Sequence, residues 1–84
     1  MTGWQLRLWR KGLLWSREQA AAELGVSLRT YKDYENAESV KRSVAMATVT
    51  LSLISMMPAL QSGQLSREQL VRMLRQMTDD VTGK

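Results

Sequence analysis

Apolar residues recur at three- and four-residue spacing in five stretches of the chain, separated by polar or glycine-containing segments. This period is typical of amphipathic α-helices, and no stretch shows the alternation of a half-buried strand. We therefore expect an all-α fold, a five-helix bundle. The expected helices run over residues 3–11, 16–25, 27–36, 41–57 and 66–81.

The first stretch places Leu6, Trp9 and Leu13 on one helix face. Trp4 and Leu8 lie off that face. Either they pack under a later helix or they are exposed, and the spacing does not decide between these alternatives.

Capping signals divide the second stretch from the third. Ser16 is expected to cap the second helix with Gln19 as its capping-box partner, and Gly25 is expected to end it. Ser27 then caps the third helix. The inner faces are expected to hold Ala20, Ala21 and Leu24 in the second helix, and Tyr31 and Tyr34, with Val26 from the turn, in the third.

The fourth stretch is apolar almost all the way round. Val44, Ala47, Leu51 and Ile54 form one stripe, and Met46, Val49, Leu53 and Met57 form a second. A helix with two apolar stripes needs two partners, so one stripe should cover the first three helices and the other should meet a second subunit or the last helix. Because this stretch contains Ser and Thr and meets Pro58, we expect a buried helix and no membrane span.

Residues 58–65 are expected to form a loop, with Gly63 as its breaker. Ser66 and Gln69 repeat the capping-box spacing at the start of the fifth helix. The inner stripe of that helix is expected to comprise Leu70, Met73, Leu74, Met77 and Val81, opposite Arg67, Arg72, Arg75 and Asp79, and the tail beyond Val81 should fray.

Composition narrows the chemistry. The 84 residues include no cysteine and no histidine, so we propose no disulfide, no metal site and no cofactor. The carboxylates are scattered without a paired apolar site, and we do not expect an enzyme. No apolar signal segment opens the chain, so we expect a cytoplasmic protein with no small-molecule ligand.

The net charge of +4 is unevenly distributed. Residues 1–42 hold eight Lys/Arg and five Asp/Glu, whereas residues 43–84 hold four and three. A basic half beside a nearly neutral half suits a nucleic-acid-facing unit joined to an association unit. We expect one domain over residues 1–84, with a DNA-reading half at 1–40 and core-completing and dimerisation helices at 41–81.

Residues 16–35 read as two short helices joined by a tight turn, the outline of a helix-turn-helix whose second helix enters the major groove of DNA. Residues 6–36 resemble the Cro/C1-type (XRE-like) helix-turn-helix family of phage and bacterial repressors. The match rests on Leu6-Arg7, Arg10, S-R-E-Q-A-A-A-E-L-G-V-S at 16–27 and R-T-Y-K-D-Y-E-N at 29–36. The resemblance implies a lambda-repressor-like DNA-binding fold.

The resemblance also implies roles for single residues. Arg10 and Glu35 match a partly buried ion pair that ties the first helix to the third. Leu14 and Ala37 depart from the family, which commonly has glycine at both positions, so the turn after the first helix is expected to be built differently. The positions that match DNA contacts are Arg17, Ser27, Leu28, Arg29, Thr30, Lys32 and Asp33.

Side-chain chemistry supports these contacts independently. Arg29 can present a fork to guanine, and Leu28 can meet a thymine methyl group. Asp33 can accept from a cytosine amino group or pair with Arg29 one turn earlier, and both readings stay open. Lys41 and Arg42 begin the fourth helix, where they could grip a phosphate.

The leading hypothesis is a sequence-specific double-stranded DNA-binding repressor. It would be a homodimeric autorepressor acting on an inverted-repeat operator of a phage or mobile-element operon, such as that of an anti-CRISPR-associated regulator. The alternative is an antitoxin-type interaction module that masks a partner protein and autoregulates its operon. The residues expected to hold the dimer are Met46, Val49, Leu53 and Met57 of the fourth helix and Leu70, Leu74 and Met77 of the fifth.

Overall fold

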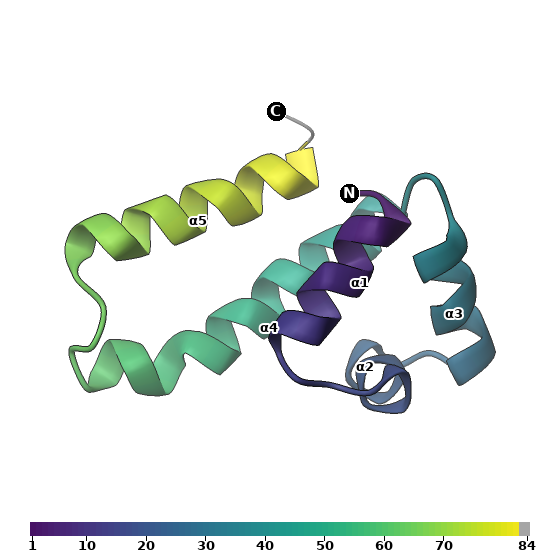
Figure 1. Ribbon diagram of the computed structural model, residues 1–84, viewed down its shortest axis with the longest axis horizontal. Helices are drawn as coiled ribbons and strands as arrows, with labels where there is room; N and C mark the ends of the chain where they lie inside the picture. The colour runs from purple at the N-terminus through teal and green to yellow at the C-terminus, as the bar shows by residue number, and fades with distance from the viewer. Residues whose placement is uncertain (83–84) are drawn as a thin grey trace.

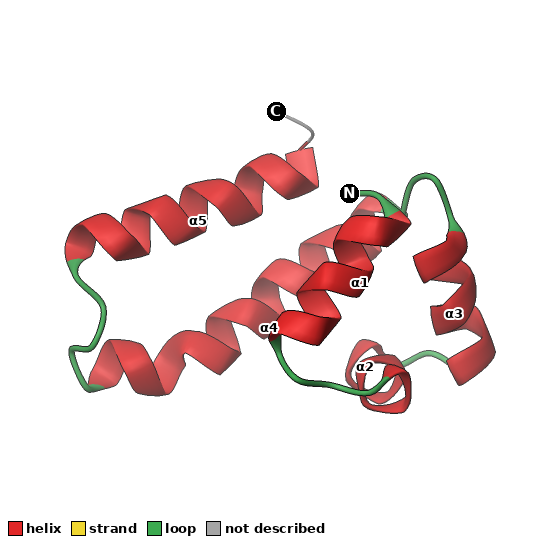
Figure 2. Ribbon diagram, viewed as in Figure 1, coloured by secondary structure: helices red, strands yellow, loops and turns green. Residues whose placement is uncertain are grey.

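The structure, a computed structural model, describes residues 1–82, and in that range it contains five α-helices and no strand (Figures 1 and 2). The helices are α1 (Gly3–Gly12), α2 (Arg17–Leu24), α3 (Leu28–Asn36), α4 (Arg42–Gln61) and α5 (Arg67–Thr82). The expected all-α fold is confirmed. Helices α1, α2 and α3 pack on one another, α4 runs past them, and α5 returns along α4 (Figure 1). The tail expected to fray lies partly outside the described residues.

Side-chain caps begin four of the helices. Ser16 Oγ and Ser27 Oγ accept from the backbone N–H groups of Gln19 and Thr30 at 3.0 and 3.1 Å. The capping box expected at Ser66 is complete, because Gln69 Oε1 also accepts from the Ser66 N–H. At Ser16 the expected box is only half formed: among the described residues the reciprocal bond from Gln19 is absent, and the Gln19 side chain stays in solvent.

Thr2 and Gln5 form a second complete capping box, at the start of α1. The sequence pattern did not single out this pair. The box fixes the first turn of α1, which lies against the end of α3.

The ends of α1, α2 and α4 share one hydrogen-bond pattern, the Schellman motif, in which one residue adopts a left-handed conformation. Gly25 and Gly63 hold this place in α2 and α4, with φ of 72° and 73°. In α1 the place is held by Leu14, with φ of 62°. The Leu14 N–H donates to Lys11 and the Trp15 N–H donates to Arg10, as the motif requires. The expectation of a differently built turn is therefore wrong, because Leu14 adopts the conformation that suits glycine.

The core lies between α1, α2 and α3. Leu6, Ala20, Ala21, Tyr31 and Val40 are buried together. Half-buried side chains close over them, including Trp9 and Trp15, whose rings meet edge to face at 5.6 Å. The expected inward positions of Tyr31 and Tyr34 are thus found, with Tyr31 the more deeply buried.

Gly3 allows α1 to approach the end of α3 directly. Its N–H donates to the Ala37 carbonyl at 3.1 Å. A Cβ at this position would collide with the carbonyl oxygens of Glu35 and Ala37. The first turn of α1 is therefore set by backbone contact with α3.

Helix α4 packs through a different face from the one expected. Its buried residues are Ala45 and Thr48, and Ser52 one turn later accepts a hydrogen bond from Trp9 Nε1 at 2.9 Å. This seam of small residues lies between the two expected apolar stripes. The expectation that one stripe covers the first three helices is therefore only partly met, because Val44 of the first stripe packs against the core whereas Ile54 of the same stripe is exposed. Small side chains in the seam let α4 lie closer to α1 and α2 than leucines would.

The expected loop at Pro58 is also wrong, since α4 continues through Pro58 to Gln61. Proline removes one helical hydrogen bond, to the carbonyl of Ile54, but both residues are exposed and water can reach that carbonyl. In length and composition α4 could cross a membrane, and only 17% of its most apolar window is buried. The expectation of a buried helix therefore does not hold for this single chain.

No described residue of α5 is fully buried. Leu70, Leu74, Met77 and Val81 are half-buried on its inner side, as expected. Met73 is exposed, contrary to expectation, because it lies at the edge of the stripe that faces α4. The pair α4–α5 is therefore more open than the unit formed by α1, α2 and α3.

Candidate nucleic-acid interface

Helix α3 begins at a turn that leaves its first residues facing outward. Gly25 ends α2 in a left-handed conformation, and Ser27 caps α3 two residues later. Ser27 Oγ also donates to Thr30 Oγ1 at 3.0 Å. The hydroxyls of Ser27 and Thr30 therefore stabilise the start of α3, which is the part of a recognition helix that meets base edges.

The outward face of α3 is polar and basic. Arg29, Lys32 and Asp33 are exposed, and Leu28 is half-buried beside them. Asn36 is exposed on the same face, one turn beyond Lys32. Sequence reasoning missed Asn36, although its spacing from Arg29 and Lys32 already predicts a shared face.

Arg29 and Asp33 are both exposed on this face. Within residues 1–82, they form no ion pair with each other.

Beneath this face lies the ion pair between Arg10 of α1 and Glu35 of α3. Arg10 Nε donates to Glu35 Oε2 at 2.7 Å, and Arg10 Nη1 donates to the Trp15 carbonyl at 3.0 Å. Both side chains are almost fully buried. Arg10 is therefore fully engaged in joining three parts of the domain: α1, the turn before α2, and α3.

Glu35 also receives Arg17 of α2, whose Nε lies 3.4 Å from Glu35 Oε1. Burial alone would raise the pKa of the Glu35 carboxyl, but Arg10 first, and then Tyr31 and Arg17, outweigh it and hold that pKa below its ordinary value. Arg17 is only partly buried, so it can contact Glu35 with one edge and face solvent with the other.

Tyr31 lies next to this pair in the core. Burial and the negative charge of Glu35 raise the pKa of its hydroxyl well above the ordinary value. Tyr31 stays neutral and acts in packing, which agrees with its expected place in the core.

Lys41 and Arg42 stand exposed where α4 begins. Lys41 supplies no side-chain cap to the helix. The start of α4 is therefore a basic, exposed helix end without a side-chain cap.

The residues expected to hold a dimer fall into two groups. Met46 and Met57 are exposed, at 56% and 48%. The others are half-buried, because α5 packs against α4 within the same chain; these are Val49, Leu53, Leu70, Leu74 and Met77. Ile54, placed in the other stripe by the sequence pattern, is 60% exposed.

Sequence reasoning gave no role to a polar pocket of about 600 Å³ between α1, α2 and α3. Its lining includes Trp4 and Arg7 from α1, together with Arg17 and Lys32. The Arg7 guanidinium lies 5.7 Å from the centre of the Trp4 ring, and Trp4 is 62% exposed. Only the three-residue spacing of Trp4 and Arg7 on a helix hinted at this pair.

A family model described as helix-turn-helix matches residues 6–49, just over half of the chain. No significant match was found among curated proteins or among solved structures. The matched segment contains α1 from Leu6 onward, α2, α3 and the start of α4, and thus both the outward face of α3 and the Arg10–Glu35 pair. The chain belongs to the Cro/C1-type (XRE-like) helix-turn-helix family of DNA-binding transcription regulators.

Proposed function

We propose that this regulator is a homodimeric repressor that binds an inverted repeat and controls its own operon in a phage or mobile element. An operon with an anti-CRISPR-associated regulator is one such setting. Repression would act by occupying the promoter and would need no cofactor. The single observation that carries the dimer is the apolar face of α4, formed by Met46, Ile54 and Met57, which are all about half exposed or more.

These three residues lie within one side of the helix, given 100° of rotation per residue. Exposed apolar groups gathered in this way are a usual mark of a protein interface. A second copy of the chain would cover them and make the complex two-fold symmetric. Two copies of α3 would then reach successive major grooves, roughly 34 Å apart, if the copies are spaced as in related dimers.

We further propose that α3 reads the half-site. Arg29 would donate to guanine O6 and N7, and Leu28 would meet a thymine methyl group. Asp33 is available to accept from a cytosine amino group, because it is not occupied by Arg29. The residues proposed to hold the backbone are Arg17, Ser27, Thr30, Lys32, Lys41 and Arg42.

The test combines oligomeric state with DNA binding. Light scattering should give twice the mass of the chain, and footprinting on the DNA upstream of the gene should protect an inverted repeat. Arg29→Ala should cost roughly 1–3 kcal/mol and relax specificity at one base pair of each half-site. An Arg29→Ala variant that ranks all operator variants as the parent does would remove the base-reading role.

The exposed face of α4 also favours a second candidate, an antitoxin-type module that covers it with a different protein. This alternative predicts a monomer that aggregates alone and becomes soluble when its partner is co-expressed. A stable dimer in light scattering would show that the protein does not require a different partner to cover this face. Cosedimentation of the pure protein with lipid vesicles would contradict both proposals.

A further inference from the structure

We propose that the polar pocket between α1 and α3 is a binding site for a phosphate of the DNA backbone, with Arg7 as the contacting residue. This inference rests on DNA binding by α3 and extends the protein footprint to α1. The pocket is lined by Trp4, Arg7, Arg17, Lys32 and Asn36, with Glu35 at its floor.

Charge favours an anion in this pocket. Arg7, Arg17 and Lys32 line it. Glu35 is the single carboxylate of the lining, and it is already held by Arg10 at 2.7 Å and by Arg17 at 3.4 Å. Three lining cations against one carboxylate leave a surplus of two positive charges.

Arg7 is the lining cation whose charge and N–H donors are least used by other groups of the protein. Among the described residues it forms no ion pair, and its buried Nε has no hydrogen-bond partner. Its guanidinium lies over the exposed Trp4 ring, which restrains the side chain without using its N–H donors. A restrained guanidinium with free donors is suited to bind a phosphate through two parallel hydrogen bonds.

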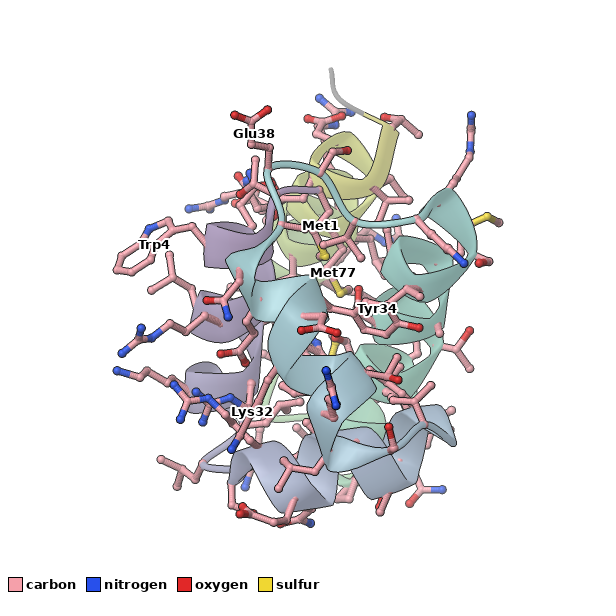
Figure 3. All side chains as sticks on the ribbon, turned by 90° about the vertical axis from the view of Figure 1, so that its right-hand side faces the viewer. Met1, Trp4, Lys32, Tyr34, Glu38 and Met77 are labelled. Carbon is pink, nitrogen blue, oxygen red and sulfur yellow. The ribbon has the colours of Figure 1, made fainter. Side chains whose placement is uncertain are left out.

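The backbone of α1 fixes where this arginine stands relative to the recognition helix. Gly3 holds the first turn of α1 against the end of α3, so the backbone that carries Trp4 and Arg7 has a fixed place beside α3. Figure 3 shows Trp4 and Lys32 projecting to the same side of the molecule, with nitrogen-bearing side chains between them. Lys32 and Asn36 belong both to the pocket and to the outward face of α3. A DNA strand bordering the groove that α3 enters would therefore pass the pocket.

The test measures affinity for a random-sequence duplex of two helical turns, which needs no knowledge of the operator. Each phosphate contact contributes about 0.9 to the slope of log affinity against log salt. Arg7→Gln should lower the slope by that amount, which makes binding about eightfold weaker at 0.1 M salt. Arg7→Lys keeps the charge and should keep most of the slope. Trp4→Ala should weaken binding while leaving the slope nearly unchanged.

Arg72→Gln is the matched control, because Arg72 is an exposed arginine on α5. It should bind as the parent does. If Arg7→Gln shows the slope of the parent, the pocket is not a DNA contact, although DNA binding by α3 stands. A parent slope near zero would overturn the proposed function itself. Inorganic phosphate could instead raise the melting temperature of the parent and not that of Arg7→Gln, while both proteins show the same DNA slope. That result would assign the pocket to a free anion and overturn the contact with the DNA backbone. Thermal melting of each variant verifies that it is folded.

Discussion

The molecule has two regions that differ in how they bury their side chains. One is the unit formed by α1, α2 and α3, and the other is the pair formed by α4 and α5. The first unit closes a core around Leu6 and Tyr31 and ties it with a buried ion pair. Among the described residues, the pair α4–α5 fully buries only Ala45 and Thr48, and it leaves large apolar side chains in solvent. The first unit therefore closes a core of its own, whereas the second leaves an apolar surface exposed in the single chain.

Under the proposed function, this difference places the two tasks of a dimeric repressor on separate surfaces. Reading DNA would require α3 to be held rigidly, and α1 and α2 pack against it. Association would require an apolar surface that a single chain leaves open, and Met46, Ile54 and Met57 of α4 are exposed. Variants in each region should thus change different measurements.

The largest effect is expected from Glu35→Ala. Removing the carboxylate leaves the buried Arg10 guanidinium unpaired, which should cost about 3–5 kcal/mol of unfolding free energy. Urea unfolding followed by tryptophan fluorescence measures this loss. Glu38→Ala is the control, because Glu38 is exposed and forms no ion pair among the described residues. Equal stability of both variants would contradict the view that this pair ties the first unit together.

Acid should weaken the same unit. The pKa of Glu35 is held below the ordinary value of 4.5, so its ionised form stabilises the folded chain above that pH. This contribution should disappear as the pH falls from 4.5 through the lowered pKa, because the folded carboxyl then gains a proton. The difference in unfolding free energy between the parent and Glu35→Gln should narrow in that range. A constant difference down to pH 3 would assign the pair no ionic role.

Ile54→Lys tests the other region. Burying an isoleucine contributes about 1.5–3 kcal/mol, so a charge in its place should weaken a dimer at least tenfold. Urea unfolding of the dilute monomer should change little, because Ile54 is exposed there. Ser55→Lys, at an exposed position off the apolar face of α4, is the control. If Ile54→Lys self-associates as the parent does in sedimentation equilibrium, the dimer interface does not lie on this face.

Gly3→Ala should destabilise the first unit by about 1–3 kcal/mol, because the added methyl group collides with the backbone of Glu35 and Ala37. Gly12→Ala is the matched control, since nothing lies within 4 Å of its added Cβ. That variant should be neutral or slightly more stable, because alanine favours helix. Thermal melting compares the two. A Gly3→Ala variant as stable as Gly12→Ala would show that α1 can shift away from α3.

How much the sequence predicts also differs between the two regions. In the first, Ser16, Ser27 and Gly25 act through local hydrogen bonds and backbone conformation, and the structure contains them where the pattern predicts. The Arg10–Glu35 pair, 25 residues apart, followed from family resemblance, because spacing alone cannot join distant residues.

The errors fall mostly on α4, which is apolar on nearly every side. Such a pattern does not indicate which face of the helix packs against the core. The seam of Ala45, Thr48 and Ser52 could therefore not be predicted from the sequence. The sequence also suggested a stop at Pro58, whereas the helix continues through this exposed position to Gln61. The role of Arg7 depends on a tertiary pocket and could not be inferred from local spacing.

The smallest expected effect concerns the one strained residue of the first unit. Leu14 adopts a left-handed conformation that costs a non-glycine residue about 1–2 kcal/mol, and its side chain is 92% exposed. A side chain so exposed has little contact with the described residues that could offset this cost. Leu14→Gly should relieve the strain, but glycine also gains freedom in the unfolded chain, so the net gain should be about 1 kcal/mol or less. Gly25→Leu, the reverse change at the equivalent place in α2, should be destabilising by a similar amount. If chemical unfolding finds Leu14→Gly less stable than the parent, Leu14 contributes a contact that offsets its strain, and the first unit is less self-sufficient than its core indicates.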